Sequence, residues 1–437
     1  MEPRIIGSGT DEHLADPFGS AALRRRVLAA WAASPARFRE DANAEEELAL
    51  GGYRDRLVVE LAQNAADAAV RAGHGPGRLR LTLADGVLAA ANTGAPLDEA
   101  AVESLSTLRA SSKRGETPAV GRFGVGFAAV LAVTDEPAVL SATGGVRWSL
   151  GEARALAAAQ PELADELRRR DGHVPLLRLP FAAEGPAPAG YDTVVVLPLR
   201  DAAAEDLTRR LLAGIDDALL LTLPGLREVV VETPDGTRTL TRDAAETRPD
   251  GVTEVTVTDD AGGRLRQTVW QTVGASGTLS AELLGDRPTE ERARPYWTVT
   301  WAVPVGPDGV PQRPKIASVL HAPTPSDEPV GLPALLIASY PLDSTRRHVA
   351  PGPLADFLTE RAADSYAELL RARGADLGSL GLVPAPLGQG ALDNALRAEV
   401  LSRLPGTPFL PHPAPVEEGT PALRPRDATL LEGADGS

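Results

Sequence analysis

The sequence Glu60–Asp67, ELAQNAAD, decides how the first half of the chain is interpreted. An α-helix turns by about 100° per residue, which places Glu60, Asn64 and Asp67 within a stripe roughly 60° wide. Gln63 flanks this stripe. The opposite side of a helix predicted from about residue 52 to residue 72 carries apolar residues: Leu57, Val58, Leu61, Ala65, Ala68 and Ala69. One face should therefore pack into a core, while the other presents a carboxylate, an amide and a second carboxylate.

This polar face has a structural and a chemical interpretation. Any surface helix carries polar residues opposite its apolar face. Against that reading, the stripe contains no Lys or Arg, and the small Ala65 and Ala66 leave room for a ligand. An Asn oxygen is a hard, neutral ligand for Mg²⁺. A nearby Glu can orient and deprotonate a water for attack on a phosphoryl group. The triplet favours a metal–phosphate site, provided that the rest of the chain supplies phosphate and base pockets.

The composition limits the possible functions. A length of 437 residues predicts two domains, or two domains and a tail. The net charge of −16 disfavours general binding to nucleic acid or to anionic membranes. The absence of cysteine excludes disulfides, thiol catalysis and Cys-ligated zinc. A polar N-terminus and the lack of a membrane-length apolar run predict a cytoplasmic protein that makes no membrane contact.

The order of predicted elements indicates the fold class. Helices are expected over residues 21–33 and up to about residue 50, before the central helix. A strand over 78–83, the turn Asp85-Gly86 and a returning strand over 87–91 form a hairpin. A helix followed by an antiparallel hairpin differs from the strand–helix–strand order of parallel nucleotide-binding folds. We expect an α/β fold with an antiparallel or mixed sheet.

Two strand termini carry candidate ligand-binding residues. The second strand runs into Asn92-Thr93-Gly94, where Asn92 can face a pocket and Gly94 allows close backbone approach. The same three residues also suit an ordinary turn. Thr193 begins a strand over 194–197. It is a good β-former, and its hydroxyl could also donate to a base ring through a water.

A glycine-rich stretch, GRFGVGF from Gly121 to Phe127, opens an apolar helix that is predicted to reach about Val133. Glycines at 121, 124 and 126 let the backbone approach a ligand, and N–H groups at a helix start suit phosphate oxygens. The stretch is not a Walker A loop, because no Gly-Lys-Ser/Thr follows, and its spacing is not that of the dinucleotide fingerprint. Alternatively it is a tight junction between helices. A polar segment that includes Lys113 precedes it.

Together these motifs resemble the GHKL ATPases, which include gyrase, the heat-shock-ninety chaperones, histidine kinases and MutL. The resemblance rests on order and spacing over about residues 20–200: an ExxxNxxDA helix, a strand ending in an NTG turn, a lid, GxxGxGF, and Gly-x-x-Thr on a strand. The sequences ELAQNAADA, SSKR and VGRFGVGF are most similar to the sacsin-like branch, which is related to the heat-shock-ninety chaperones.

The resemblance implies a Bergerat-type ATP-binding domain, an α+β two-layer sandwich, with ATP and Mg²⁺ as cofactors. It implies that Glu60 is the general base, Asn64 the Mg²⁺ ligand, and Asp67 a residue that fixes the pocket or lid. Thr193 would reach the adenine through water, and Lys113 would contact phosphate. The residues that would wrap the phosphates are Gly121, Arg122, Phe123, Gly124, Val125, Gly126 and Phe127.

One position departs from the family pattern. The family usually has Asp in the base-binding turn that precedes Gly94, where this chain has Asn92. The Asn oxygen can still accept from the adenine amino group, and its amide can also donate. Adenine therefore stays the expected base, while affinity and base selectivity are open.

The second half predicts a further α/β domain over residues 201–373, after a first domain over 1–200, and a Pro- and Gly-rich tail over 374–437. Trp297 and Trp301 alternate with valines in a strand and are expected in the core of this domain.

The stretch 317–349 resembles the sacsin-like segment after the ATPase domain and the heat-shock-ninety middle domain. By that resemblance Arg346 or Arg347 reaches the γ-phosphate, as an arginine finger does. The alternative is that both arginines are solvated.

The leading functional prediction is a slow, Mg²⁺-dependent, chaperone-type ATPase that binds ATP and ADP and acts on client or partner proteins. One alternative is a nucleotide-binding switch with little hydrolysis, which Asn92 favours and Glu60 opposes. Another is a DNA-linked GHKL protein of the repair, topoisomerase or defence type, which the acidic charge opposes. A histidine kinase is disfavoured, because no phospho-accepting His helix precedes the motifs. The sequence leaves a homodimer open.

Overall fold

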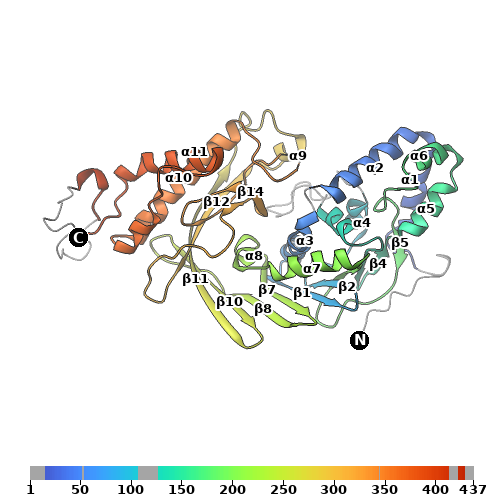
Figure 1. Ribbon diagram of the computed structural model, residues 1–437, viewed down its shortest axis with the longest axis horizontal. Coiled ribbons are helices and arrows are strands. Elements are labelled where there is room, and N and C mark those ends of the chain that lie inside the picture. Colours follow the sequence, from blue (N-terminus) through green and yellow to red (C-terminus); the bar gives the residue numbers. More distant parts are fainter. Residues whose placement is uncertain (1–14, 52–53, 107–125, 344, 413–421, 429–437) are drawn as a thin grey trace. The chain divides into compact units, whose positions relative to one another are not determined.

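The chain folds into two units in the computed structural model, which describes residues 15–51, 54–106, 126–343, 345–412 and 422–428. The first unit comprises residues 1–241 and 259–265, and the second comprises residues 242–258 and 266–437. Both combine helices with a β-sheet (Figure 1). The mixed α/β fold class predicted from the sequence is confirmed.

The first unit carries the sequence motifs. Its helices are α1 (Ser20–Ala33), α2 (Pro35–Leu50), α3 (Leu57–Ala72), α4 (Glu99–Leu105), α5 (Leu150–Ala158), α6 (Ala164–Arg169), α7 (Ala202–Ala213) and α8 (Asp217–Thr222). Short 3₁₀ helices are η2 (Arg54–Arg56), η3 (Gly126–Ala132) and η4 (Pro161–Leu163). Its strands are β1 (Gly77–Ala84), β2 (Val87–Asn92), β3 (Ala138–Ser141), β4 (Gly144–Arg147), β5 (Phe181–Ala183), β6 (Thr193–Pro198), β7 (Leu226–Thr233) and β8 (Gly236–Arg242).

The strand order in this unit is β8-β7-β1-β2-β6-β3-β4-β5. All neighbours pair antiparallel except β1 and β7, which are parallel. The predicted hairpin is present: Asp85 and Gly86 have φ angles of 49° and 73°, the left-handed pair that a tight two-residue turn requires. The sheet is therefore mixed, with an antiparallel centre.

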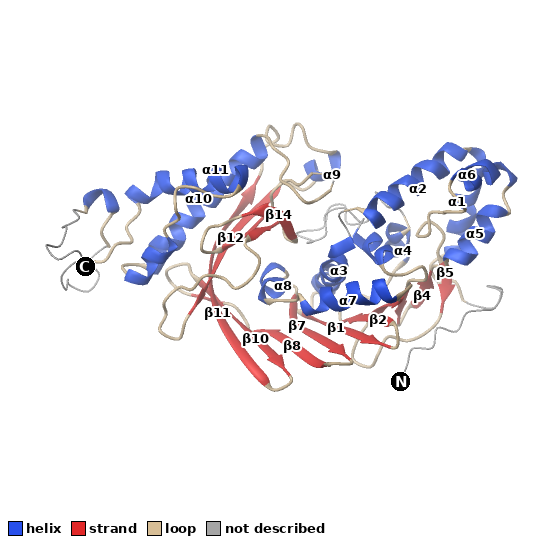
Figure 2. Cartoon of the chain, in the orientation of Figure 1, coloured by secondary structure: helices blue, strands red, loops and turns tan. Residues whose placement is uncertain are grey.

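Helices cover one face of this sheet. Leu79, Leu81 and Leu83 alternate along β1 and are buried, while the residues between them are partly exposed. Helices α3 and α7 lie over that buried side (Figure 2). The layering of helices on one sheet face is that of a two-layer α+β arrangement.

The first unit extends beyond the predicted domain end at residue 200. Strand β7 pairs in parallel with β1 over Leu226–Glu232, and α7 packs against α3. Residues 201–241 thus complete the sheet and helix layer of the first unit instead of starting the second. Parallel pairing across such a long crossover leaves no local signal in the sequence.

The second unit contains β9 (Glu246–Thr247), β10 (Thr253–Ala261), β11 (Arg264–Thr278), β12 (Tyr296–Val305), β13 (Val319–His321), β14 (Pro325–Pro329) and β15 (Leu335–Ala338). Its helices are α9 (Thr289–Arg292), α10 (Pro353–Arg373), α11 (Gly390–Arg403), and the 3₁₀ helices η5 (Leu377–Leu382), η6 (Leu404–Gly406) and η7 (Pro425–Asp427). The strand order is β14-β13-β15-β12-β11-β10, with β9 on β10.

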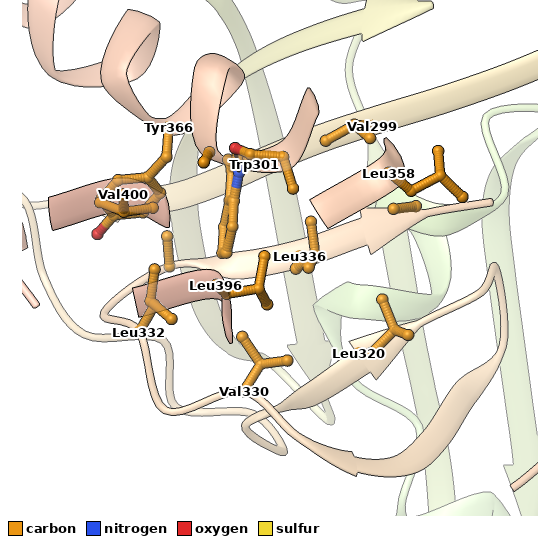
Figure 3. Packing of buried hydrophobic residues seen from close by; sticks show 14 of the residues in the cluster. Val299, Trp301, Leu320, Val330, Leu332, Leu336, Leu358, Tyr366, Leu396 and Val400 are labelled. Atoms are coloured by element: carbon orange, nitrogen blue, oxygen red, sulfur yellow. Dashed lines mark hydrogen bonds between the residues drawn. The ribbon is translucent and has the colours of Figure 1, made fainter. Parts of the chain in front are cut away.

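Aromatic and aliphatic side chains from β12, β15, α10 and α11 form the core of this unit (Figure 3). The Trp301 ring meets the Tyr366 ring edge-on at 4.8 Å, and Trp301 Nε1 donates to Ala362 O at 2.8 Å. Trp297 is also buried and meets the Phe357 ring edge-on. Both tryptophans are core residues, as the strand alternation predicted.

Part of the predicted tail belongs to this core. Leu392, Leu396 and Val400 recur every four residues along α11, are buried, and pack with α10. Residues 390–403 therefore complete the second unit, whereas the sequence analysis placed them in a tail over 374–437. Across the described ranges, no helix is both long and apolar enough to span a membrane.

Candidate functional site

Helix α3 carries the polar stripe. It begins at Leu57 after the 3₁₀ turn η2, and ends at Gly73, whose φ of 70° provides the left-handed cap. Glu60 and Asp67 are 4% and 2% exposed, so this stripe is largely buried and is not a solvated surface. Asn64 is the exposed member. The flanking Gln63 is buried, and its Oε1 has no hydrogen-bond partner among the described residues.

Two glycines let other segments approach the backbone of α3. A Cβ on Gly94 would lie 2.5 Å from Ala68 C, and one on Gly225 would lie 2.8 Å from Ala66 O. Ala95 N donates to Ala68 O at 2.9 Å. The turn at Gly94 is therefore held directly against α3.

The glycine-rich stretch meets the stripe at Gly126. A Cβ built on Gly126 would lie 1.9 Å from Glu60 Oε2, so glycine is the residue that fits against this carboxylate. Gly126 begins η3, a seven-residue 3₁₀ helix at the place where the sequence predicted an apolar helix. Runs of 3₁₀ helix longer than three or four residues are uncommon and often mark a functional or strained segment.

Phe127, the other described residue of the glycine-rich stretch, points into the core. It is 5% exposed, and its ring lies 5.4 Å from that of Trp148. Its side chain therefore anchors η3. The remaining predicted phosphate-binding residues lie outside the described residues: Lys113, Gly121, Arg122, Phe123, Gly124 and Val125.

Three polar residues form a row across neighbouring strands. Asn92 at the end of β2 pairs with Thr193 at the start of β6, and Thr193 pairs with Ser141 at the end of β3. Directly opposed residues of antiparallel strands share a face. Asn92 also pairs with Leu79, which places the row on the helix-covered face. All three residues are buried.

The row contains an unused hydrogen-bonding group. Thr193 Oγ1 is buried and makes no hydrogen bond to any described residue. Ser141 Oγ accepts from Leu97 N and bonds Thr143 Oγ1 at 3.0 Å, and Asn92 Nδ2 donates to Thr93 O at 3.3 Å. A buried hydroxyl without a partner is uncommon in proteins and requires an explanation such as a bound water or ligand.

Asp192, which the sequence analysis did not assign, fixes the adjoining turn. Its Oδ2 accepts from Gly94 N at 2.8 Å, and its own N–H donates to Asn92 O at 2.9 Å. Gly94 has a φ of 140°, which favours glycine. Ser141 was missed as well. The local signal was a polar residue at a strand end, but only the strand register shows that it joins the row.

Arg346 and Arg347 lie in the second unit. Arg347 Nη1 forms an ion pair with Asp327 Oδ2 at 2.9 Å, with both side chains partly exposed. Arg346 is half-buried and has a φ of 56°, a left-handed conformation that is uncommon outside glycine. Hydrogen bonds from Thr345 and from the N–H of Arg347 hold the Asp343 carboxylate beside them and lower its pKa, although partial burial opposes this.

The site combines a buried hydroxyl and a buried carboxylate from separate elements. No group of three or more His, Asp or Glu side chains suited to a metal occurs in the part of the chain that the structure describes. A magnesium ion held by few protein ligands and by phosphate oxygens needs no such group. Thr193 Oγ1 is a buried hydroxyl without a hydrogen-bond partner among the described residues, and Gly126 places no side chain of its own against the Glu60 carboxylate.

Comparisons with known proteins add no assignment. A scan against models of protein families gives no match to the chain, and a search of curated proteins finds no significant similarity.

Proposed function

We propose that the first unit binds Mg²⁺·ATP in a Bergerat-type site and hydrolyses it slowly, as part of a chaperone-like cycle of lid and domain closure. One observation carries the proposal: Gly126, from the glycine-rich stretch, lies against the carboxylate of Glu60 from ELAQNAAD. These two sequence signals are far apart in the chain, and each alone is weak. Their contact is what a phosphate-binding loop beside a general base requires.

The chain's residues take distinct roles in this proposal. Glu60 orients a water and accepts its proton, while its burial beside η3 limits competing solvent. Asn64, exposed on the same helix face, would hold Mg²⁺, which when bound neutralises charge on phosphate oxygens. Asp67, buried on the same helix face, would help fix the pocket or the lid.

The polar row is the proposed base site. Thr193 Oγ1 would donate to adenine through a water, and Asn92 would accept from the amino group. Gly94 and Asp192 hold the turn that presents Asn92. Arg346 or Arg347 would stabilise charge on the γ-phosphate, as the family resemblance implies. Client proteins, a homodimer and a cytoplasmic location remain parts of the proposal.

The test measures Mg²⁺·ATP binding and phosphate release in the same samples. Glu60→Ala should bind ATP but release phosphate at least about 100-fold more slowly, since a general base contributes that much or more. Asn64→Ala should lose Mg²⁺-dependent binding. Gly126→Ala should slow phosphate release, because the new Cβ displaces the Glu60 carboxylate.

The matched control is Gly381→Ala, whose Cβ meets no atom within 4 Å and should leave both measurements unchanged. Binding without any phosphate release by the wild type would favour the non-hydrolysing switch. Hydrolysis that persists in Glu60→Ala would remove Glu60 from its assigned role.

A further inference from the structure

A cavity lies in the first unit, at the other end of η3 from Gly126. It has a volume of about 650 Å³, within the range of small-molecule sites. Leu131 and Ala132 of η3 line it, together with residues of α2, of the α5 and α7 N-termini, and of the 173–176 loop. None of the residues assigned to the Glu60 site lines this cavity, so it does not depend on the proposed function.

The cavity has an apolar floor. Ala49, Ala132 and Leu150 are partly exposed and contribute aliphatic surface to it, as does the exposed Ala203. Leu131, Val174 and Leu176 also line the cavity but are almost fully buried, with exposures of 7%, 0% and 2%. Binding an apolar ligand body against this floor is favourable, because it removes apolar surface from water. A small, wholly polar solute would leave this surface without a partner.

The acids that line the cavity are all engaged within the protein. Glu45 accepts hydrogen bonds from Leu176 N and Leu177 N. Glu46 forms an ion pair with Arg170 at 2.9 Å, and Asp135 forms one with Arg200 at 2.7 Å. Asp201 caps α7 by accepting from Ala204 N at 2.8 Å. None of these carboxylates therefore needs a ligand cation.

Two arginines that line the cavity have N–H donors that no described residue uses. Arg54 forms no side-chain hydrogen bond or ion pair with any described residue, and it borders the cavity from η2. Arg154 of α5 donates from Nε to Gly172 O at 3.0 Å, and its terminal amino groups have no partner in the described ranges. Guanidinium groups with free N–H donors suit carboxylates and related oxyanions.

We propose that this cavity binds an amphipathic organic monoanion, a carboxylate on an apolar body of aromatic or medium-chain aliphatic type. The apolar body lies on the floor at Ala132 and Leu150, and the carboxylate pairs with Arg54 and Arg154. A polyanion is disfavoured, because its extra charges would face Glu46, Asp135 and Asp201. A single carboxylate accepts from both guanidinium groups without breaking an internal ion pair.

The test uses 2-naphthoate and its uncharged isostere 2-naphthamide, titrated calorimetrically into the full chain. We expect 2-naphthoate to bind at one site, and 2-naphthamide to bind at least about 10-fold more weakly, a difference of roughly 1.4 kcal/mol. Arg54→Gln and Arg154→Gln should each weaken 2-naphthoate binding several-fold and leave the amide unaffected. Arg25→Gln, an exposed arginine away from the cavity, is the matched control and should change neither.

A second variant keeps the proposal falsifiable if an arginine variant folds poorly. Ala203 lines the cavity and is itself exposed, so Ala203→Trp should fill the space without disturbing a core, and abolish binding of both compounds. The proposal is overturned if 2-naphthoate binds no better than 2-naphthamide, if Ala203→Trp binds normally, or if no saturable binding occurs at millimolar concentration.

Discussion

Two buried polar clusters differ in how fully their hydrogen bonds are satisfied. In α11 of the second unit, Asp393 is completely buried and accepts from Gly331 N at 3.0 Å, Gln389 N at 2.8 Å and Arg397 Nε at 3.1 Å. Arg397 also donates to Ala385 O at 2.7 Å. In the first unit, Thr193 Oγ1 and Gln63 Oε1 are buried without partners among the described residues.

The difference separates a structural cluster from a candidate binding site. Buried charges that are fully hydrogen-bonded hold the loops that they bind. Removing one partner of such a pair leaves the other charge buried without a partner, which is strongly destabilising. A buried oxygen without a hydrogen bond carries an uncompensated desolvation cost. A bound ligand or water that donates a hydrogen bond to it offsets that cost. We therefore assign Asp393 and Arg397 to stability, whereas the ligand-binding role of Thr193 is a proposal.

His321 of β13 shows that an unsatisfied group alone does not define a site. It is 5% exposed, and neither ring nitrogen has a hydrogen-bond partner in the described part of the chain. Burial lowers its pKa to about 4, so the ring is neutral near pH 7. A neutral ring is far cheaper to bury than a charged group. Thr193 differs because Asn92 and Ser141 extend its polar row.

The largest expected effect comes from breaking the satisfied cluster. Asp393→Ala leaves Arg397 buried without its carboxylate and should lower the free energy of unfolding by about 3–5 kcal/mol. Urea denaturation measures this loss. Glu368→Ala, which breaks the exposed Glu368–Arg371 pair of α10, is the control and should cost less than about 1 kcal/mol. Equal losses in the two variants would contradict the structural role of the α11 pair.

A smaller effect should appear at Glu45, a buried carboxylate that has N–H donors but no directly bonded cation. Burial raises its pKa to about 7 from 4.5, although the N–H groups of Leu176 and Leu177 and the charge of Arg178 oppose the shift, while Asp41 adds to it. Because the folded state binds this proton more tightly, its contribution to stability is full below pH 4.5 and is lost as the pH rises through 7.

The shift corresponds to roughly 3 kcal/mol. Glu45→Gln should therefore show less loss of stability than the wild type between pH 5 and pH 8, measured as unfolding free energy at each pH. Glu40→Gln, an exposed position on the same helix, is the control and should follow the wild-type curve. If the Glu45→Gln and wild-type curves run parallel, the carboxyl does not take up a proton on folding in this range.

The smallest effect compares two buried threonines. Thr359 Oγ1 donates to Ala355 O at 2.8 Å and bonds Tyr340 OH at 3.1 Å, so Thr359→Val should cost about 1–3 kcal/mol. Thr193→Val removes a hydroxyl without a protein partner and should leave stability unchanged, or raise it by up to about 1 kcal/mol. Thermal unfolding of the two apo variants decides the comparison. A loss in Thr193→Val equal to that in Thr359→Val would mean that its hydroxyl already has a partner.

Local patterns were enough to predict most elements. The apolar spacing of α3 and the Asp85-Gly86 turn each arise within a few residues of the chain. The contact between Gly126 and Glu60 could not be derived this way, since it depends on how η3 packs on α3. Only the resemblance to a family linked these two motifs before the structure.

Features that depend on pairing between distant segments were missed. The parallel pairing of β7 with β1 moved the unit boundary to residue 241, and the register of β3 with β6 brought Ser141 beside Thr193. The buried face of α11 was not recognised, because a helix rich in charged residues within a Pro- and Gly-rich stretch gives a weak apolar signal. In each case the element pairs or packs with a segment that is distant from it in the sequence.

The most direct test of the central claim is calorimetric binding of Mg²⁺·ATP to the wild type, Thr193→Val and Asn92→Asp. The account predicts one site in the wild type, weaker binding in Thr193→Val, and tighter or more adenine-selective binding in Asn92→Asp, because a carboxylate is the stronger acceptor for the adenine amino group. No ATP binding by the wild type, or binding that neither substitution changes, would contradict it.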